Sequence, residues 1–323
     1  MSEYAKKFTV CSFYVGGGLL DYAFKNHFHI IWANEINPSA ARCYQKNVGD
    51  HLVVGDIEEL SYDDIPPADV YLGTPPCPDY STDGVNRGER GETGKHIWNF
   101  FRVIEKKMPK VFLFENVSGL KARHQETLLG YIHSFKKIGY RISMQEIEAA
   151  EFGSPSDRKR VFLVGVRTDL GFEFQFPRAT GLTMNVYQAI GNLPAPGETE
   201  GTSGCIPNHI STWTSPSPER IRRITSNPNP KQWHGLRRLN WNKQSHTLVA
   251  HIAKDGREFI HPSEDRKITV REMLRLMGMP DTFVIPAEVV TTQQYRLVGN
   301  GVAFSVGDAL ARALFDQMTN SIV

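Results

Sequence analysis

The chain has 323 residues, of which 40% are hydrophobic and 22% charged, as in an ordinary globular protein of one or two domains. No apolar run approaches the roughly 18 residues that span a bilayer, and the polar start is followed by a run too short for a signal peptide, so we expect a cytoplasmic protein. The four cysteines form no CxxC pair and lack zinc-type histidine spacing, which argues against a disulfide framework and a structural metal.

The net charge is only +2, but the charge is distributed unevenly. Residues 207–267 contain eleven Lys and Arg against five Asp and Glu, so this segment holds the positive charge of the chain. Such a segment is either an ordinary solvated surface or a lobe that binds a polyanion such as nucleic acid. Charge alone does not decide between the two.

The first half of the chain alternates short apolar runs with amphipathic stretches. The apolar runs predict strands at Phe8–Phe13, His29–Ala33, Leu52–Val54, Val70–Leu72, Val111–Phe114, Tyr140–Ile147 and Val161–Val166. Helical spacing predicts helices near Leu19–Lys25, Pro38–Asn47, His96–Lys107 and Gln125–Ile138, and Asn37 before Pro38 offers an N-cap. This alternation is typical of βαβ units, so we predict an α/β fold with a mainly parallel sheet.

The composition and the hydrophobic spacing of the sequence change after about residue 176. Seven prolines fall between Pro194 and Pro230 and the periodicity is lost, which predicts a loop-rich second domain. Regular spacing then returns and predicts two more helices, Ile268–Leu276 and Val302–Met318.

Glycine and acidic residues follow the first three predicted strands. The first strand leads into the turn Gly16–Gly18, where the backbone can approach a ligand closely at the carboxyl edge of the sheet. Glu35 ends the second strand and can accept hydrogen bonds from both hydroxyls of a ribose. Asp56 after the third strand can accept from an adenine amino group. The pattern predicts an adenosyl site; a solvated strand end for Glu35 and a turn cap for Asp56 are the alternatives.

A dinucleotide dehydrogenase is the rival within this architecture. Its GxGxxG turn is not present as such, because Val15 occupies a position where a phosphate-binding turn would need glycine. No turn that binds pyrophosphate is evident, which argues against a dinucleotide cofactor.

A cysteine and an acid follow the next two strands. Cys77 comes after Pro75 and Pro76, which stiffen the backbone and hold the thiol in place; the alternative is a rigid turn with an incidental cysteine. Glu115 follows the apolar run Val111–Phe114, where desolvation should raise the pKa of the carboxyl group above its usual value of about 4.3.

A thiol and a hydrogen-bonding acid beside an adenosyl site suit the methylation of cytosine at C5, a carbon too weakly nucleophilic to take a methyl group directly. Addition of the Cys77 thiolate to C6, with Glu115 hydrogen-bonded to N3 and the exocyclic amine, makes C5 nucleophilic. Loss of the C5 proton after methyl transfer then expels the thiol.

These residues resemble the motifs of the C5-cytosine DNA methyltransferase family, and the resemblance covers nearly all of the chain in the family's motif order. It implies a Rossmann-like S-adenosylmethionine-dependent methyltransferase domain, residues 1–177 and 281–323, which the C-terminal helix completes. A smaller loop-rich target-recognition domain, residues 178–280, is implied with a hinge near 268–294. The implied enzyme is a monomeric DNA (cytosine-5-)-methyltransferase without a metal, serving restriction-modification or phage modification.

The resemblance also assigns roles to single residues. It implies that Cys77, Glu115, Arg158 and Arg160 are catalytic, and that the helix with Arg271 and Glu272 organises the recognition domain. The implied S-adenosylmethionine ligands are Phe13, Gly16, Gly17, Gly18, Glu35, Ile36, Asp56, Ile57, Pro75, Asn300 and Val302.

The chain departs from the family pattern at three positions. Val15 replaces a glycine of the first motif, Pro78 stands where glutamine commonly follows the cysteine, and Ser156 replaces the glutamine usually found before the Arg158-Lys159-Arg160 run. None of these changes removes a group that the chemistry needs.

Duplex DNA keeps C5 of a paired cytosine inside the base stack, so the nucleotide must be flipped out. The segment Ser81–Lys95 contains four glycines and is longer than an ordinary connection, which predicts a closing lid; a surface loop is the alternative. Arg158 and Arg160 suit a base carbonyl and a phosphate, or an ion pair at the sheet edge. The expected DNA-binding residues are Ser81, Arg87, Arg90, Arg237, Arg238 and Thr247.

Two rival functions remain open. One branch of the family acts on tRNA; the sizeable basic lobe favours duplex DNA, and a competition assay between DNA and tRNA would decide. The other rival is a catalytically silent relative that only binds nucleic acid, against which the intact Cys77 and Glu115 argue.

Overall fold

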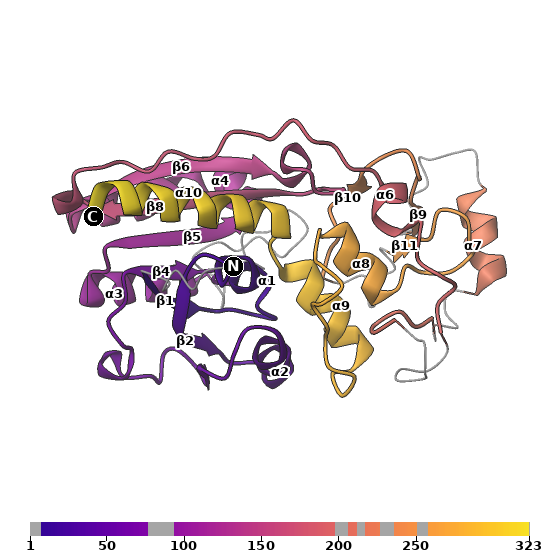
Figure 1. Ribbon diagram of the computed structural model, residues 1–323, viewed down its shortest axis with the longest axis horizontal. Coiled ribbons are helices and arrows are strands. Elements are labelled where there is room, and N and C mark those ends of the chain that lie inside the picture. The colour runs from indigo at the N-terminus through magenta and orange to yellow at the C-terminus, as the bar shows by residue number, and fades with distance from the viewer. Residues whose placement is uncertain are drawn as a thin grey trace.

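The computed structural model describes residues 8–76, 94–197, 206–211, 217–226, 236–250 and 258–322 and has an α/β fold. A seven-stranded sheet with the order β3-β2-β1-β4-β5-β8-β6 forms the larger part, and most elements of residues 186–300 lie to one side of it (Figure 1). The strands are β1 (Thr9–Phe13), β2 (His29–Glu35), β3 (Leu52–Val54), β4 (Val70–Gly73), β5 (Val111–Val117), β6 (Tyr140–Glu148) and β8 (Lys159–Arg167).

Strands β1 to β5 are all parallel to one another, whereas β8 is antiparallel to both β5 and β6. The prediction of a mainly parallel sheet is therefore confirmed, with a strand at each of the seven predicted places. The run Val111–Phe114 is fully buried, as expected for a central strand covered on both faces. Its residues alternate between the faces: Val111 and Leu113 belong to one hydrophobic cluster, Phe112 and Phe114 to another.

Helices cover both faces of the sheet. α1 (Leu19–Phe24) and the C-terminal helix α10 (Phe304–Ile322) pack on each other and on the face of Val111, whereas α3 (His96–Lys107) and α5 (Gln125–Lys137) cover the face of Phe112. Figure 1 shows α10, at the end of the chain, lying along the sheet, whose strands come from residues 9–167. The remaining helices of this part are α2 (Pro38–Asn47), α4 (Ser118–Arg123) and the 3-10 turns Tyr62–Asp64, Ala149–Phe152 and Thr168–Leu170.

Helix α2 begins where the sequence predicts. The side chain of Asn37 accepts hydrogen bonds from the N–H groups of Ser39, at 2.9 Å, and Ala40, at 3.2 Å, and Pro38 occupies the first helical position. The predicted N-cap is confirmed, and it fixes the direction in which the chain leaves β2.

We call residues 178–280 the small lobe. Strands β9 (Leu236–Arg238) and β11 (Glu258–Ile260) pair in parallel within it, and β10 (Ser245–His246) pairs with β7 (Ser156–Asp157) at the foot of β8. Apolar residues of the lobe, including Leu239 and Leu248, join the hydrophobic cluster of the sheet, so the lobe is packed onto the larger part. The helices on this side of the sheet are α6 (Val186–Ile190), α7 (Pro218–Thr225), α8 (Val270–Leu276) and α9 (Thr291–Asn300).

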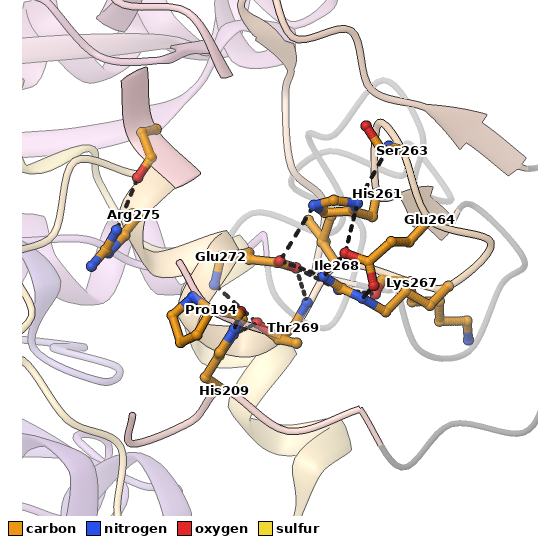
Figure 2. Close-up of polar contacts among 12 residues, drawn as sticks. Pro194, His209, His261, Ser263, Glu264, Lys267, Ile268, Thr269, Glu272 and Arg275 are labelled. Atoms are coloured by element: carbon orange, nitrogen blue, oxygen red, sulfur yellow. Dashed lines mark hydrogen bonds and ion pairs between the residues drawn. The ribbon is translucent and has the colours of Figure 1, made fainter. Parts of the chain in front are cut away.

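Helix α8 begins at Val270 rather than at Ile268, because Thr269 is its N-cap. The hydroxyl of Thr269 accepts the N–H of Glu272 at 3.2 Å, and the carboxylate of Glu272 accepts the N–H of Thr269 at 2.7 Å. The same buried carboxylate accepts two hydrogen bonds from Arg266, and Figure 2 shows it facing His261. The start of α8 is therefore held by charged groups of the preceding loop.

In the part of the chain that the structure describes, no helix is both long and apolar enough to cross a membrane. The same residues contain no group of three or more His, Cys, Asp or Glu side chains able to hold a metal ion.

Candidate active site

A cavity of about 970 Å³ lies at the carboxyl ends of β1, β2, β4 and β5, and α9 and residues 247–250 of the small lobe line it as well. The predicted site residues that line it are Gly16, Gly17, Glu35, Ile36, Pro75, Glu115, Arg158, Arg160, Arg237, Thr247, Asn300 and Val302. Phe13, Gly18, Asp56, Ile57 and Arg238 do not line it. Cys77, Pro78, Ser81, Arg87 and Arg90 lie outside the described residues, as does most of the predicted lid.

Glu35 ties the glycine turn to the end of β2. Its Oε2 accepts the N–H of Gly16 and its Oε1 the N–H of Asn37, both at 2.8 Å. Gly16 and Gly18 have φ angles of 54° and 81°, a conformation that glycine adopts at little cost. Burial raises the pKa of Glu35, and the N–H groups of Asn37 and Gly16 oppose the rise. The turn is thereby fixed beside a carboxyl group on the cavity wall.

This corner of the cavity fits an adenosyl ligand. Each carboxylate oxygen of Glu35 keeps a further lone pair for a ribose hydroxyl. A Cβ on Gly16 would meet nothing within 4 Å, so open space faces the turn. Ile36 leaves 60% of its surface exposed in the same cavity, an apolar surface of the kind on which a flat ring packs.

The four cofactor-site predictions that do not line the cavity occupy other places. Phe13 is buried among aromatic rings of the core, and Ile57 is buried in the same cluster. Gly18 is the N-cap of α1 with a positive φ angle. The carboxylate of Asp56 accepts the N–H of Glu58 at 3.0 Å, which is the turn-cap alternative. In the structure these four residues thus contribute to the core, to the start of α1 and to the turn after β3.

Two departures from the family pattern are explained by packing. Val15 packs against Ala33 and Tyr44 beneath the glycine turn. Ser156 is fully buried and pairs with Ser245 where β7 meets β10. Val15 supports the turn, and Ser156 lies where the small lobe joins the sheet.

The turn that precedes Cys77 is held by both neighbouring strands. The hydroxyl of Thr74 donates to the carbonyl of Tyr14 at 2.8 Å, at the end of β1. The side-chain amide of Asn116 donates to the carbonyl of Pro75 at 3.4 Å, from the end of β5. The backbone that leads to the predicted nucleophile is therefore anchored at the edge of the cavity.

Glu115 and Arg160 form a buried ion pair on the cavity wall. Nε of Arg160 lies 3.0 Å from Oε1 of Glu115, and the two side chains are only 14% and 8% exposed. Burial raises the pKa of Glu115, while the positive charges of Arg160 and Arg158 oppose the rise. The predicted direction of the shift is confirmed. A carboxyl group in this setting takes up a proton more readily than one in water and can then donate it in a hydrogen bond.

Arg158 has a different setting from the one that the sequence suggests. It is 2% exposed, and its guanidinium donates to the carbonyl of Leu248 at 2.9 Å and to that of Gly299 at 2.8 Å. Two of its nitrogens are thus bonded to the main chain of two other segments, and its contact with a base carbonyl or a phosphate stays a prediction.

The small lobe brings Thr247 and Arg237 to the cavity. The hydroxyl of Thr247 donates to the carbonyl of Asp157 at 2.6 Å, and Arg237 is exposed. Arg238 next to it donates to two main-chain carbonyls and to the carboxylate of Asp265. Its guanidinium thus joins parts of the lobe, and its contact with DNA stays a prediction.

The polar residues that line the cavity without being predicted as site residues include His246, Gln293 and Arg296. His246 immediately precedes Thr247, and the other two lie on α9, a helix that was not predicted. The spacing of the buried Tyr295 and Val298 is the signal that could have revealed this helix.

Comparisons with known proteins agree with one another. The family model for C-5 cytosine-specific DNA methylases matches residues 8–316. The Type II methyltransferase M.NgoFVII of Neisseria gonorrhoeae is 33% identical, over 94% of this chain and 85% of its own length. M.MthTI of Methanothermobacter thermautotrophicus, also a Type II methyltransferase, is 31% identical over 94% of this chain and 96% of its own. The solved structure of the methyltransferase EhMeth of Entamoeba histolytica has the same fold, with a TM-score of 0.74 at 18% identity over 96% of this chain and 98% of that one.

Proposed function

The chain belongs to the C-5 cytosine-specific DNA methylase family, and from that premise we propose that Cys77 is the nucleophile of a DNA (cytosine-5-)-methyltransferase. Its substrate in this proposal is a cytosine flipped out of a specific short sequence of duplex DNA. Its methyl donor is S-adenosylmethionine, the donor that the family implies.

The buried pair of Glu115 and Arg160 is the observation that supports this proposal most strongly. Because β4 and β5 are parallel neighbours, the turn before Cys77 and the end of β5 leave the same edge of the sheet. A protonated Glu115 can donate to N3 of cytosine and its second oxygen can accept from the exocyclic amine. The guanidinium of Arg160 can donate to the carbonyl oxygen of the same base. The pair thus suits the edge of cytosine that carries the carbonyl oxygen, N3 and the exocyclic amine.

In the proposed reaction the thiolate of Cys77 acts first as the nucleophile and then as the leaving group. Its sulfur adds to C6, forming an S–C6 bond and moving the electron pair of the C5–C6 double bond to C5, while Glu115 hydrogen-bonds N3. After C5 has taken the methyl group, a base removes the C5 proton. The electron pair of that C–H bond restores the double bond, the S–C6 bond breaks, and the thiolate returns.

The cofactor supplies an electrophilic methyl group when it is bound. Glu35 would hold the ribose hydroxyls, Ile36 would pack on the adenine, and the turn at Gly16 and Gly17 would lie close to the ligand. Pro75, Asn300 and Val302 line the same cavity and complete the proposed cofactor site. Contacts from Phe13, Gly18, Asp56 and Ile57 stay predictions.

The DNA in this proposal binds along the small lobe. The positive charge of residues 207–267 in this lobe favours a polyanion, and Arg237 and Thr247 of the lobe line the cavity. Ser81, Arg87 and Arg90 stay predictions as further DNA contacts, and so does closure of the segment Ser81–Lys95 over the flipped base.

The names of the two relatives support a biological setting. Both are Type II methyltransferases, so we place the protein in restriction and modification of DNA. A cytoplasmic location, a monomeric state and the domain division at residues 178–280 stay predictions.

Transfer of label from methyl-tritiated S-adenosylmethionine to DNA tests the proposed function. We expect label in plasmid DNA from a methylation-deficient host, and loss of that label in Cys77→Ser while DNA binding is largely retained. Competing tRNA should remain unlabelled. Label in tRNA but not in DNA would replace the proposal by the RNA alternative, and full activity of Cys77→Ser would remove the cysteine from the mechanism.

A further inference from the structure

Three segments that are far apart in the sequence meet at Arg158. This residue lies between β7 and β8, and its guanidinium donates to Leu248 of the small lobe and to Gly299 near the end of α9. These partners are 90 and 141 residues away along the chain. One buried side chain therefore joins the sheet, the small lobe and α9.

A second contact brings the same segments together without Arg158. A Cβ on Gly299 would lie 2.5 Å from the backbone nitrogen of Ala250, so α9 and the lobe segment touch main chain to main chain. On the sheet side, the hydroxyl of Thr247 donates to the carbonyl of Asp157 at 2.6 Å. Residues 247–250 are thus fixed from both sides, and we call this contact region the joint.

We propose that Arg158 is a positioning residue that keeps residues 247–250 and the end of α9 in one fixed arrangement around the cavity. The inference rests on the proposed function, in which Thr247 faces the DNA and Asn300, directly after Gly299, faces the cofactor. In this inference Arg158 acts through residues 247–250 and the end of α9 rather than on a ligand. It sets the distance between the two places where they bind.

The chemistry of the side chain explains why arginine is needed. A guanidinium is planar and has several N–H groups in fixed directions, so NH1 and NH2 donate to two carbonyls of different segments at once. Lysine would keep the charge but has a single nitrogen on a flexible stem. It cannot reproduce this bridge, so Arg158→Lys perturbs the joint while conserving charge.

The strand itself offers a matched control. Arg167 at the other end of β8 donates to the carbonyl of Met108 at 2.7 Å and pairs with Asp169, away from the cavity. Arg167→Lys removes a similar contact from the same strand. Arg158 is 2% exposed and the side chain of Arg167 30%, so the two variants need not lose the same stability. The kcat values are therefore compared at a temperature at which thermal unfolding shows both variants folded, where loss of positioning affects only Arg158→Lys.

Two measurements on the full-length variants test the inference. Hydrogen exchange of the protein without ligands should become faster in peptides covering both 245–250 and 298–302 in Arg158→Lys, and in neither for Arg167→Lys. With plasmid DNA as substrate, kcat should fall on the order of 10- to 100-fold in Arg158→Lys, because a small misplacement of the reacting groups costs about that much. Arg167→Lys should keep the wild-type kcat.

Each other outcome contradicts the inference. A loss of kcat without faster exchange would mean that Arg158 acts on the substrate directly, and unchanged values of both would mean that the joint does not depend on it. If Arg158→Lys fails to fold, Gly299→Ala perturbs the joint from the α9 side and should give the same two changes. If the wild type transfers no methyl group, the proposed function fails, and the exchange measurement still decides whether Arg158 holds the joint.

Discussion

Glu115 obtains its chemistry from its neighbours. The apolar strand before it buries the carboxyl group and raises its pKa, and Arg160 at 3.0 Å limits that rise. Neither neighbour alone would suit the reaction: burial without the arginine leaves an isolated acid, and the arginine in water would keep the acid ionised. The opposing effects of burial and Arg160 leave the carboxyl group able to change between its ionised and its protonated, donating form.

Glu115→Gln tests this balance. Glutamine keeps the shape of the side chain but cannot be protonated at the position that faces N3, so we expect the rate of the chemical step to fall about 10²- to 10⁴-fold. The Kd values for DNA and for S-adenosylhomocysteine should stay within a few-fold of wild type. Single-turnover transfer of labelled methyl groups measures the step. An unchanged rate would remove Glu115 from the mechanism.

The neighbours Arg237 and Arg238 should respond differently to replacement by alanine. Arg237→Ala should weaken DNA binding by about 1–3 kcal/mol if the residue reads a base, or lower the salt dependence of binding by one phosphate contact. Arg238→Ala should instead lower the Tm, because it breaks contacts within the lobe. DNA binding titrations at several salt concentrations and thermal unfolding separate the two. Equal effects on both quantities would contradict this division.

The sequence predicts chemical groups better than it predicts their partners. Glu35 and Glu115 follow apolar runs, so their burial at strand ends could be anticipated. The partners of Arg158 could not, because Leu248 and Gly299 are brought to it only by the tertiary fold. A charged residue therefore reads as a ligand contact in the sequence even where the structure uses it internally.

Helix α8 is held by polar contacts at its start and on the side of Arg271, beside the apolar face that packs in the core. Thr269 and Glu272 cap its start, and Arg271 donates to the carbonyls of Pro207 and Phe283, both at 2.9 Å. Arg266, in the preceding loop, donates two hydrogen bonds to the carboxylate of Glu272 and balances its negative charge. These contacts tie the helix to three other segments, in keeping with the expected role of this helix in organising the small lobe.

Thr269→Ala should lower the free energy of unfolding by about 1 kcal/mol, within the usual range of about 0.5–2 kcal/mol for an N-cap. The hydroxyl that accepts the N–H of Glu272 is lost, and the buried His209, whose ring nitrogen lies 2.8 Å from that hydroxyl, loses a partner. Urea unfolding measures the change. Ser217→Ala at the exposed start of α7 is the control and should cost less; an equal or larger effect there would contradict the account.

Element boundaries follow the sequence where the buried face is mainly apolar, with a single polar residue in each of α2 and α3. The predicted bounds of Pro38–Asn47 and His96–Lys107 are those of α2 and α3. Helix α9 was missed because its buried face includes Gln294 and Gly299, which interrupt the apolar spacing. The strands of the small lobe are only two or three residues long, too short for alternation to reveal them.

A buried carboxyl group, that of Asp21, lies between the sheet and its helices. Asp21 in α1 is 1% exposed, and burial raises its pKa to about 7, although hydrogen bonds from Ser12 and Tyr44 oppose the rise. Between about pH 4 and about pH 7 the folded protein therefore holds a proton that the unfolded chain has released. Unfolding becomes more favourable as the pH rises through this window.

Asp21→Asn removes that titration while keeping the shape of the side chain. We expect the wild-type Tm to fall from about pH 4 to about pH 7, and the Tm of Asp21→Asn to fall less over the same range. Thermal unfolding at several pH values measures the difference. Parallel curves for the two proteins would show that Asp21 does not hold the proton.

The cavity draws its walls from both parts of the molecule, with cofactor-type residues on the sheet and DNA-type residues on the small lobe. The proposed function predicts one product, cytosine methylated at C5 within a defined DNA sequence. Bisulfite sequencing of plasmid DNA from cells that express the protein tests it most directly. We predict protected cytosines at one recurring short sequence with the wild type and none with Cys77→Ser. Complete conversion of every cytosine with the wild type, or protection that persists in Cys77→Ser, would contradict the account.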